Sequence, residues 1–407
     1  MTEKENKLYL NKHILYGVKD DMNNVFSQEI HYLRQNFCGK IVTDMKDLNK
    51  VKIDTIIYMY GNINTFLNEM ENKNNKTIYA IKELSYNFDN YLDSIQLVTL
   101  GEVPINIHNI GVFFRNFFNN KNYFDLLNKE HQFQVLTESN KPGSSYRKGI
   151  YITNVVDDND SINFNLLRCS TNLDGPTDNF RETDHEIITK VSNMTKYLFE
   201  QPTDLNHVLA QVYNNTTVDG KDKKAKIKDH SDKTKDMPRN GLMAFCTFYK
   251  FNDNIKEVKK HKDDPYDYYY KDASVLTRLR FRLKSCVNVP NLVKSFDVVL
   301  YPNSVFLMSL TTNRLYTHEI VPSHLPIDKL PIRLGYVIRC SKTYAVFKNN
   351  QTYINDNGRL VELIHPNKEL MKGLKDTYFK ENTSDEIIDY GLVDFSLNNG
   401  DYMKPLV

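Results

Sequence analysis

Apolar and polar residues alternate over much of the chain, a pattern that predicts short β-strands. The predicted strands share β-branched and aromatic residues between turn-forming ones: Leu205–Tyr213, Leu242–Phe251, Leu276–Leu283, Ser295–Leu300, Val305–Leu310, Arg333–Arg339 and Tyr344–Phe347. Many short strands separated by turns are typical of a sandwich or barrel. We therefore expect a β-rich core.

The first 105 residues follow a different pattern. Val51–Tyr60 is β-branched and aromatic and is followed by Gly61, which predicts a strand. Asn62–Lys73 has apolar residues on one helical face, and Thr77–Ile81 predicts a second strand. We interpret residues 1–105 as a small α/β unit with a β-α-β element, to which the sequence assigns no role.

Two further helices are predicted beside the core. Thr183–Glu186 has the form of a capping box and opens a helix. Its apolar face holds Ile187, Val191, Met194 and Leu198. The chain after Pro366 is expected to be helical and then irregular, while Lys221–Lys228 and the charged, tyrosine-rich Lys256–Asp272 are expected to be loops. The predicted class is α+β, with a core over residues 106–365 and a C-terminal extension over 366–407.

Charge and composition exclude several classes of protein. The 407 residues include 53 basic and 51 acidic side chains, so the net charge of +2 fits neither a polybasic tail binder nor an acidic solvating chain. No run of 18 apolar residues and no apolar leader segment occurs, so we expect an intracellular protein, cytoplasmic or nuclear, with no membrane partner. The five cysteines are scattered without a C-x-x-C pair, which favours reduced thiols.

The chemistry of the chain centres on one His-x-Asp pair. His230 and Asp232 follow a predicted strand, where side chains two residues apart lie on one face. An imidazole and a carboxylate suit Fe(II) when a second histidine completes the set and leaves coordination positions open. His318, between apolar stretches, is the candidate third ligand. Alone, a His-x-Asp pair is more often a solvated polar turn than a ligand pair, and His318 alone is more often a core or surface histidine.

A later strand carries two arginines on the same face. Arg333 and Arg339 are six residues apart, so both guanidinium groups lie on one side of the predicted strand. Two arginines on a buried face need an anion, and arginine binds carboxylates through two parallel hydrogen bonds. This pattern indicates a dicarboxylic co-substrate. The alternative is an edge strand with both arginines in water.

Taken in order, His-x-Asp, a distal histidine and R-x₅-R resemble the Fe(II)/2-oxoglutarate-dependent dioxygenases, specifically their AlkB-like branch. The resemblance spans residues 110–347. Leu205–Tyr213 is similar to the AlkB strand that ends in Asn-x-Tyr, although Gln211 stands where asparagine is usual. The spacing from Tyr213 to His230 is longer than in the family, which indicates an inserted loop.

The resemblance implies a fold, a site and a reaction. The fold would be a double-stranded β-helix, or jelly roll, with flanking helices. Fe(II) would be held by His230, Asp232 and His318, and 2-oxoglutarate by Tyr213, Gln211, Arg333 and Arg339. O₂ would take the last coordination position, and the enzyme would hydroxylate a substrate C–H bond while 2-oxoglutarate is converted to succinate and CO₂.

The substrate class stays open at this stage. AlkB relatives demethylate alkylated nucleobases, and Arg280 and Arg282, together with Lys221–Lys228, are basic enough to follow a phosphate backbone. Lys233 and Thr234, which follow the aspartate of the His-x-Asp pair, are further candidate substrate contacts, as are Arg280 and Arg282, but AlkB has an acidic residue where Thr234 stands. The alternatives are a protein or small-molecule hydroxylase of the same fold, a catalytically degenerate binding protein, and a zinc hydrolase, which would give the two arginines no purpose.

Overall fold

The structure, a computed structural model, describes residues 5–17, 27–51, 54–70, 76–89, 93, 95–137, 144–168, 173–201, 203–251, 255 and 257–407. Parts of three sequence predictions lie outside these residues: 52–53 of the first predicted strand, 71–73 of the helix that follows it, and Lys256. Cys169 also lies outside them. Within the described part, the cysteines are free thiols, namely Cys38, Cys246, Cys286 and Cys340.

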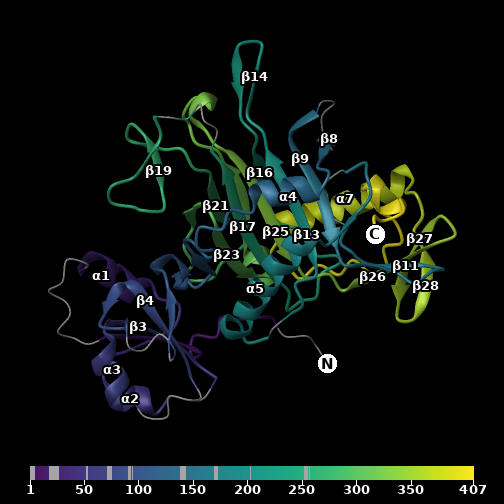
Figure 1. Ribbon diagram of the computed structural model, residues 1–407. Helices are drawn as coiled ribbons and strands as arrows, with labels where there is room; N and C mark the ends of the chain where they lie inside the picture. The colour runs from purple at the N-terminus through teal and green to yellow at the C-terminus, as the bar shows by residue number, and fades with distance from the viewer. Residues whose placement is uncertain are drawn as a thin grey trace.

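The N-terminal part forms a parallel sheet with strand order β2-β1-β3-β4-β5 (Figure 1). Its strands are β1 (His13–Gly17), β2 (Lys40–Val42), β3 (Ile56–Asn62), β4 (Thr77–Tyr86) and β5 (Gln96–Val98). Its helices are α1 (Ser27–Asn36), α2 (Met45–Asn49) and α3 (Ile63–Glu69). The predicted β-α-β element is present as β3-α3-β4, because buried Ile63, Phe66 and Leu67 fix α3 against the sheet.

Two antiparallel sheets form the centre of the molecule. The major sheet has strand order β12-β9-β13-β25-β17-β23-β7-β6, with β8 paired to β9, and only the β12–β9 pair is parallel. Its strands are β6 (Ile105–Ile107), β7 (Gly111–Phe114), β8 (Gln134–Thr137), β9 (Ser144–Thr153), β12 (Asp178–Asn179), β13 (His207–Tyr213), β17 (Leu242–Lys250), β23 (Ser304–Ser309) and β25 (Ile332–Arg339). The minor sheet has order β16-β24-β21-β22, formed by β16 (Ile227–His230), β21 (Arg278–Leu283), β22 (Ser295–Val299) and β24 (Tyr316–Val321).

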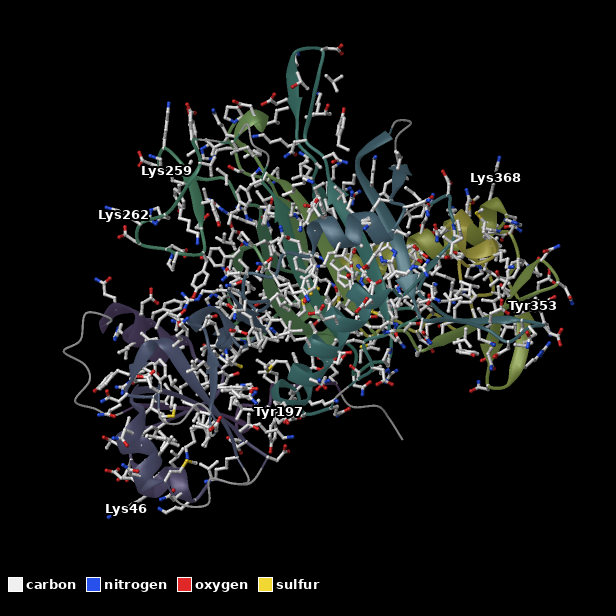
Figure 2. All side chains as sticks on the ribbon, viewed as in Figure 1. Lys46, Tyr197, Lys259, Lys262, Tyr353 and Lys368 are labelled. Atoms are coloured by element: carbon white, nitrogen blue, oxygen red, sulfur yellow. The ribbon has the colours of Figure 1, made fainter. Side chains whose placement is uncertain are left out.

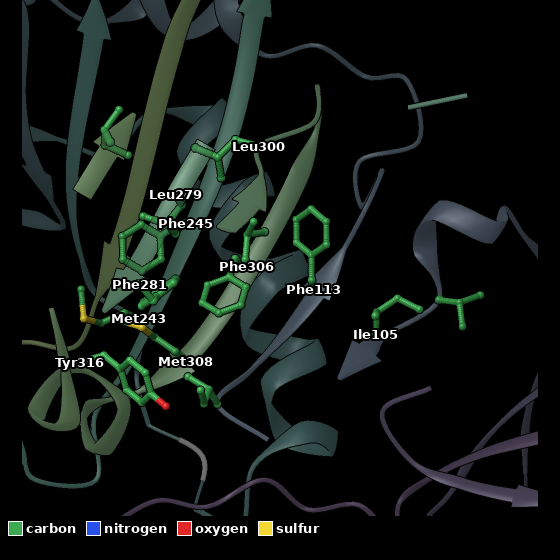
Figure 3. Packing of buried hydrophobic residues seen from close by; sticks show 14 of the residues in the cluster. Ile105, Phe113, Met243, Phe245, Leu279, Phe281, Leu300, Phe306, Met308 and Tyr316 are labelled. Atoms are coloured by element: carbon green, nitrogen blue, oxygen red, sulfur yellow. The ribbon is translucent and has the colours of Figure 1, made fainter. Parts of the chain in front are cut away.

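Apolar side chains from both sheets meet between them (Figure 3). Phe306 of the major sheet contacts Phe281 of the minor sheet, with ring centroids 5.3 Å apart, and Phe281 stacks on Phe296. The chain passes repeatedly from one sheet to the other, so residues on the two inner faces come from distant parts of the sequence. The candidate site residues lie on these inner faces.

Further elements surround the two sheets. A lateral sheet of order β10-β11-β26-β27-β28 is formed by β10 (Val155–Asp157), β11 (Ile162–Leu166), β26 (Thr343–Lys348), β27 (Gln351–Asp356) and β28 (Arg359–Glu362). The remaining helices are α4 (Phe124–Glu130), α5 (Glu182–Leu198), α6 (Leu310–Leu315) and α7 (Lys368–Thr383). Tyr197 of α5 lies at the junction with the N-terminal sheet, where its ring is 6.3 Å from that of His13 (Figure 2).

Three local predictions were wrong. Lys221–Lys228 is not a loop: β14 (Thr216–Val218) and β15 (Lys221–Lys223) form a hairpin, which turns at Asp219 and Gly220 with positive φ angles of 51° and 70°. The segment up to Asp272 contains β18 (Lys259–Lys260) and β19 (Tyr268–Tyr270), which pair with each other, and β19 also pairs with β20 (Ala273–Ser274).

The third wrong prediction concerns the start of α5. The carboxylate of Asp184 accepts from the backbone N–H of Arg181, so the helix begins before Thr183. The predicted apolar face is otherwise present, with Ile187, Val191 and Leu198 buried. The α+β class is also observed. None of the helices in the described part combines the length and apolar character needed to cross a bilayer.

Candidate metal centre and anion pocket

The two histidines of the predicted triad face each other across the minor sheet. His230, the last residue of β16, is paired directly with His318 of β24, and their ring centroids are 4.5 Å apart. His230 Nδ1 lies 2.8 Å from the carbonyl of Lys228, which orients its Nε2 toward Asp232. His318 is 4% exposed and is packed against the rings of Phe245 and Phe281.

Asp232 completes the cluster from the segment after β16. Its Oδ1 lies 3.3 Å from His230 Nε2 and 3.9 Å from His318 Nε2, and the ligand atoms of all three residues lie within 4.8 Å of one another. Asn313 of α6 fixes the backbone of Asp232: its Oδ1 accepts from the Asp232 N–H at 2.8 Å and its Nδ2 donates to the Asp232 carbonyl at 2.9 Å. The sequence-predicted triad is therefore brought together.

The protonation states in this cluster suit metal binding. Burial is the main reason that the pKa of His318 is lowered to about 3, so its imidazole is neutral. Burial alone would raise the pKa of Asp232, but the Arg339 guanidinium and His230 hold it well below its usual range. Two imidazoles and a carboxylate form the donor set that non-haem Fe(II) takes with positions left open.

Arg339 links the metal cluster to the major sheet. Its guanidinium Nη2 lies 2.6 Å from Asp232 Oδ2, and the residue is 4% exposed. Arg339 is the last residue of β25. The contact therefore joins the second arginine of the R-x₅-R motif to the aspartate of the His-x-Asp motif. The structure thus places Arg339 beside the candidate ligand cluster, and its predicted contact with the co-substrate stays a prediction.

Arg333, at the other end of β25, has hydrogen-bond donors to spare. It is 4% exposed, and its guanidinium lies over the ring of Tyr213, 3.7 Å from the centroid. Its Nε and Nη2 are buried, and no described residue accepts a hydrogen bond from them. A Cβ on Gly335 would lie 2.8 Å from Arg333 Nη1, so the glycine leaves the space that the guanidinium occupies. A buried cation with two free donors is a site for a carboxylate.

Gln211 and Tyr213 lie beside this arginine on the same face. The Tyr213 hydroxyl donates to Gln211 Oε1 at 3.1 Å, and Tyr213 is paired with Arg333 between β13 and β25. The structure therefore brings Gln211, Tyr213 and Arg333 together, while Arg339 lies at the other end of β25 beside Asp232.

The sequence analysis missed several polar side chains on this inner face. The Thr247 and Ser304 hydroxyls and His207 Nδ1 are buried and have no hydrogen-bond partner among the described residues. Thr247 is paired with Gly335 on one side and Ser304 on the other, while His207 is paired with Arg339. For Thr247 the sequence did hold a signal. It is two residues from Phe245 on one strand, and side chains at this spacing lie on the same face.

The predicted substrate contacts Lys233 and Thr234 are engaged within the protein. Lys233 Nζ donates to Asn382 Oδ1 at 2.6 Å, and the Thr234 N–H donates to Glu381 Oε1 at 3.1 Å. Both partners belong to α7. In the structure these two residues therefore contact α7. Their position after Asp232 had indicated a substrate contact.

The predicted cationic strand face is neutralised by acidic neighbours. Arg280 forms a bidentate pair with Asp297 at 2.7 and 2.9 Å, and Arg282 Nη2 lies 2.6 Å from Glu319. Lys284 is not on this face, because it is buried and donates to backbone carbonyls near the end of α7. Arg280 and Arg282, which were predicted to follow a phosphate backbone, are thus engaged in ion pairs with neighbouring strands.

A second group of possible metal ligands is a closed hydrogen-bond network. His131 Nδ1 lies 2.8 Å from Asp178 and its Nε2 lies 2.9 Å from Asp184, which also accepts from the Tyr336 hydroxyl. Burial alone would lower the pKa of His131, but the two carboxylates raise it to about 9. Both ring nitrogens are therefore occupied, and this imidazolium holds α5 to the major sheet instead of offering a lone pair.

Comparisons with known proteins add little to this geometry. No protein-family model matches the chain, and no curated protein matches it. The solved structure of OsALKBH1, an AlkB homologue, is similar with a TM-score of 0.34 and 12% sequence identity, over 56% of this chain and 96% of that one. A likeness at this level is distant and carries no functional argument, so the assignment that follows rests on the site itself.

Proposed function

We propose that the chain is an Fe(II)- and 2-oxoglutarate-dependent dioxygenase that hydroxylates a C–H bond of its substrate. Residues 106–365 would form the catalytic domain, residues 1–105 an N-terminal unit and residues 366–407 an extension. The observation that carries the proposal is the contact between the two motifs. The ligand atoms of Asp232 and the two histidines lie within 4.8 Å of one another, and Asp232 pairs with Arg339 at one end of β25. Arg333, near the other end of that strand, has two buried donors that no described residue uses.

The strand order supports a double-stranded β-helix as the core. The central strands of the major sheet run β13-β25-β17-β23, and the minor sheet runs β16-β24-β21-β22. The chain alternates between the sheets, with β13, β17, β23 and β25 in one and β16, β21, β22 and β24 in the other. This interleaving supports a jelly roll, in which two Greek keys are folded together.

Each residue of the site has a role in the proposed reaction. His230, Asp232 and His318 would hold Fe(II), while Arg333 would bind the far carboxylate of 2-oxoglutarate. Arg339 keeps Asp232 ionised and oriented, and the packing of Phe245 and Phe281 around His318 excludes water from one side of the centre. When bound, iron, 2-oxoglutarate and O₂ supply the oxidising power for hydroxylation, and succinate and CO₂ are released.

Two alternatives are less well supported by these contacts. A zinc hydrolase would use the triad but would leave the buried donors of Arg333 without a ligand. A degenerate binding protein would not need three ligand atoms held within 4.8 Å by buried neighbours. On the substrate, the pairing of Arg280 and Arg282 with acidic residues removes the main support for a nucleic acid, so the proposal stops at the reaction class.

Succinate formation tests the proposal. Purified protein with Fe(II), ascorbate and 2-oxoglutarate in air should produce succinate even without a prime substrate, and chelation of the metal should abolish it. Asp232→Asn should be inactive because it removes the charge from the ligand set. Asp229→Asn, the matched change three residues away on the exposed face, should retain turnover. Equal turnover in both variants, or none in the unaltered protein, would overturn the assignment.

A further inference from the structure

The segment that carries Asp232 is held by the last turns of α7, a helix outside the proposed catalytic domain. We infer that α7 positions the metal-binding aspartate and that Asn382 is the positioning residue through which it acts. The inference rests on the metal centre proposed above. It assigns a role to the C-terminal extension, for which the sequence predicted only helix followed by irregular chain.

Asn382 contacts both residues that flank Asp232. Its Oδ1 accepts from the backbone N–H of Ser231 at 2.9 Å and from Lys233 Nζ at 2.6 Å. Lys233 Nζ also donates to the carbonyls of Ser231 and Tyr378, at 3.0 and 3.2 Å. One amide oxygen therefore closes a network around the peptide that carries the ligand.

The next residue along the segment is held in the same way. Glu381 Oε1 accepts from both the N–H and the hydroxyl of Thr234, and Glu381 Oε2 accepts from the Tyr390 hydroxyl at 2.5 Å. Glu381 is 6% exposed, so these bonds are shielded from water. The residue before the ligand, Ser231, and the two after it, Lys233 and Thr234, are thus held by two neighbouring residues of α7.

The C-terminal end of α7 is in turn anchored to the minor sheet. Lys284, which follows β21, donates through Nζ to the carbonyls of Glu381 at 2.6 Å and Ser384 at 3.0 Å. A cation at the carboxyl end of a helix satisfies carbonyls that have no partner within the helix. Because β21 and β24 are neighbours in one sheet, this contact places α7 in a fixed relation to His318.

Asp232 is therefore held from two sides. The side chain of Asn313 in α6 binds the backbone N–H and carbonyl of Asp232, and α6 leads directly into the strand of His318. Asn382 holds the residues before and after it. A metal ligand must be kept within ~0.5 Å of its working position. Loss of the Asn382 acceptor should loosen Asp232 without removing any metal ligand.

Metal affinity separates this role from a general structural one. Co(II) binding to the full-length protein is measured by calorimetry and by its visible absorption, for the unaltered chain and for Asn382→Leu, Asn382→Asp and Lys375→Ala. Asn382→Leu removes the acceptor at similar size, and its Co(II) affinity should fall by about tenfold or more, as typical for residues that orient metal ligands. Asn382→Asp keeps the acceptor oxygen and should bind within about twofold of the unaltered protein. Lys375→Ala, on an exposed position of the same helix, should be unchanged.

The outcomes distinguish the inference from the proposal beneath it. If Asn382→Leu is folded by circular dichroism and binds Co(II) with unaltered affinity and spectrum, the inference is wrong while the metal centre stands. If the unaltered protein binds no Co(II), both the metal centre and the inference fail. Asn382→Ala gives the same comparison with a smaller side chain should the leucine variant not fold.

Discussion

Replacing Arg333 by lysine keeps the positive charge in the proposed 2-oxoglutarate pocket but removes the planar fork. Arg333 has two buried donors, Nε and Nη2, that no described residue uses, and its guanidinium carbon lies over the ring of Tyr213, 3.7 Å from the centroid. A carboxylate can accept from both donors at once. A lysine ammonium at the same place offers a point charge without this paired geometry.

The loss in 2-oxoglutarate affinity follows from the hydrogen bond that lysine cannot make. Loss of one of two charge-assisted hydrogen bonds costs about 1.5–3 kcal/mol. Since about 1.4 kcal/mol corresponds to a tenfold change in affinity, Arg333→Lys should weaken 2-oxoglutarate binding by roughly 10- to 100-fold. Mn(II) affinity should stay the same, because Arg333 is not among the residues that contact Asp232 or the two histidines.

Calorimetry under anaerobic conditions measures both quantities on the same sample. Mn(II) is titrated first, and 2-oxoglutarate is then titrated into the loaded protein. Arg280→Lys is the matched control, because Arg280 is engaged with Asp297 on the outer face and its replacement should leave both affinities unchanged. A 2-oxoglutarate affinity within twofold of the unaltered protein in Arg333→Lys would refute the assignment of this residue.

Three further predictions follow from other contacts. Gly335→Ala places a Cβ 2.8 Å from Arg333 Nη1 and should displace that side chain, so 2-oxoglutarate binding should weaken while Mn(II) binding is retained; equal co-substrate affinity would contradict this. The pKa of His131, raised to about 9 from 6.5, means that its stabilisation is complete below pH 6.5 and is lost as pH rises through 9, so the free energy of unfolding in urea should fall by about 3 kcal/mol over that window; a flat profile would argue against it. Because Arg280 and Arg282 are paired with acidic residues, their replacement by alanine should leave the salt dependence of any oligonucleotide binding unchanged, whereas a slope lower by about one unit per arginine would restore the nucleic-acid interpretation.

The sequence predicted the strands in which side chains alternate regularly between a buried face and the opposite face. On β25 the period of two placed Arg333 and Arg339 on one side. Both are buried, which decides between the two alternatives that the sequence had left open. The hairpin at Asp219 and Gly220 was missed although its signal was present: an Asp-Gly pair with two positive φ angles is a preferred two-residue hairpin turn. The high charge of Lys221–Lys223 hid the second strand of the hairpin.

Other features have no local signature at all. Asn382 meets Ser231 across 151 positions of sequence, and nothing around either residue indicates the pairing. The same holds for the acidic partners of Arg280 and Arg282, which come from neighbouring strands of the minor sheet. Pairing across a sheet depends on which strands become neighbours, so it could not be predicted from the alternation within one strand.

The most direct test of the central claim is a crystal structure of the protein with Mn(II) and 2-oxoglutarate. The account predicts a single ion bound by His230, Asp232 and His318 at ~2.0–2.2 Å, by analogy with other first-row metal sites, and a far carboxylate on Arg333. An ion bound elsewhere, for example beside His131, or 2-oxoglutarate held away from Arg333, would contradict it.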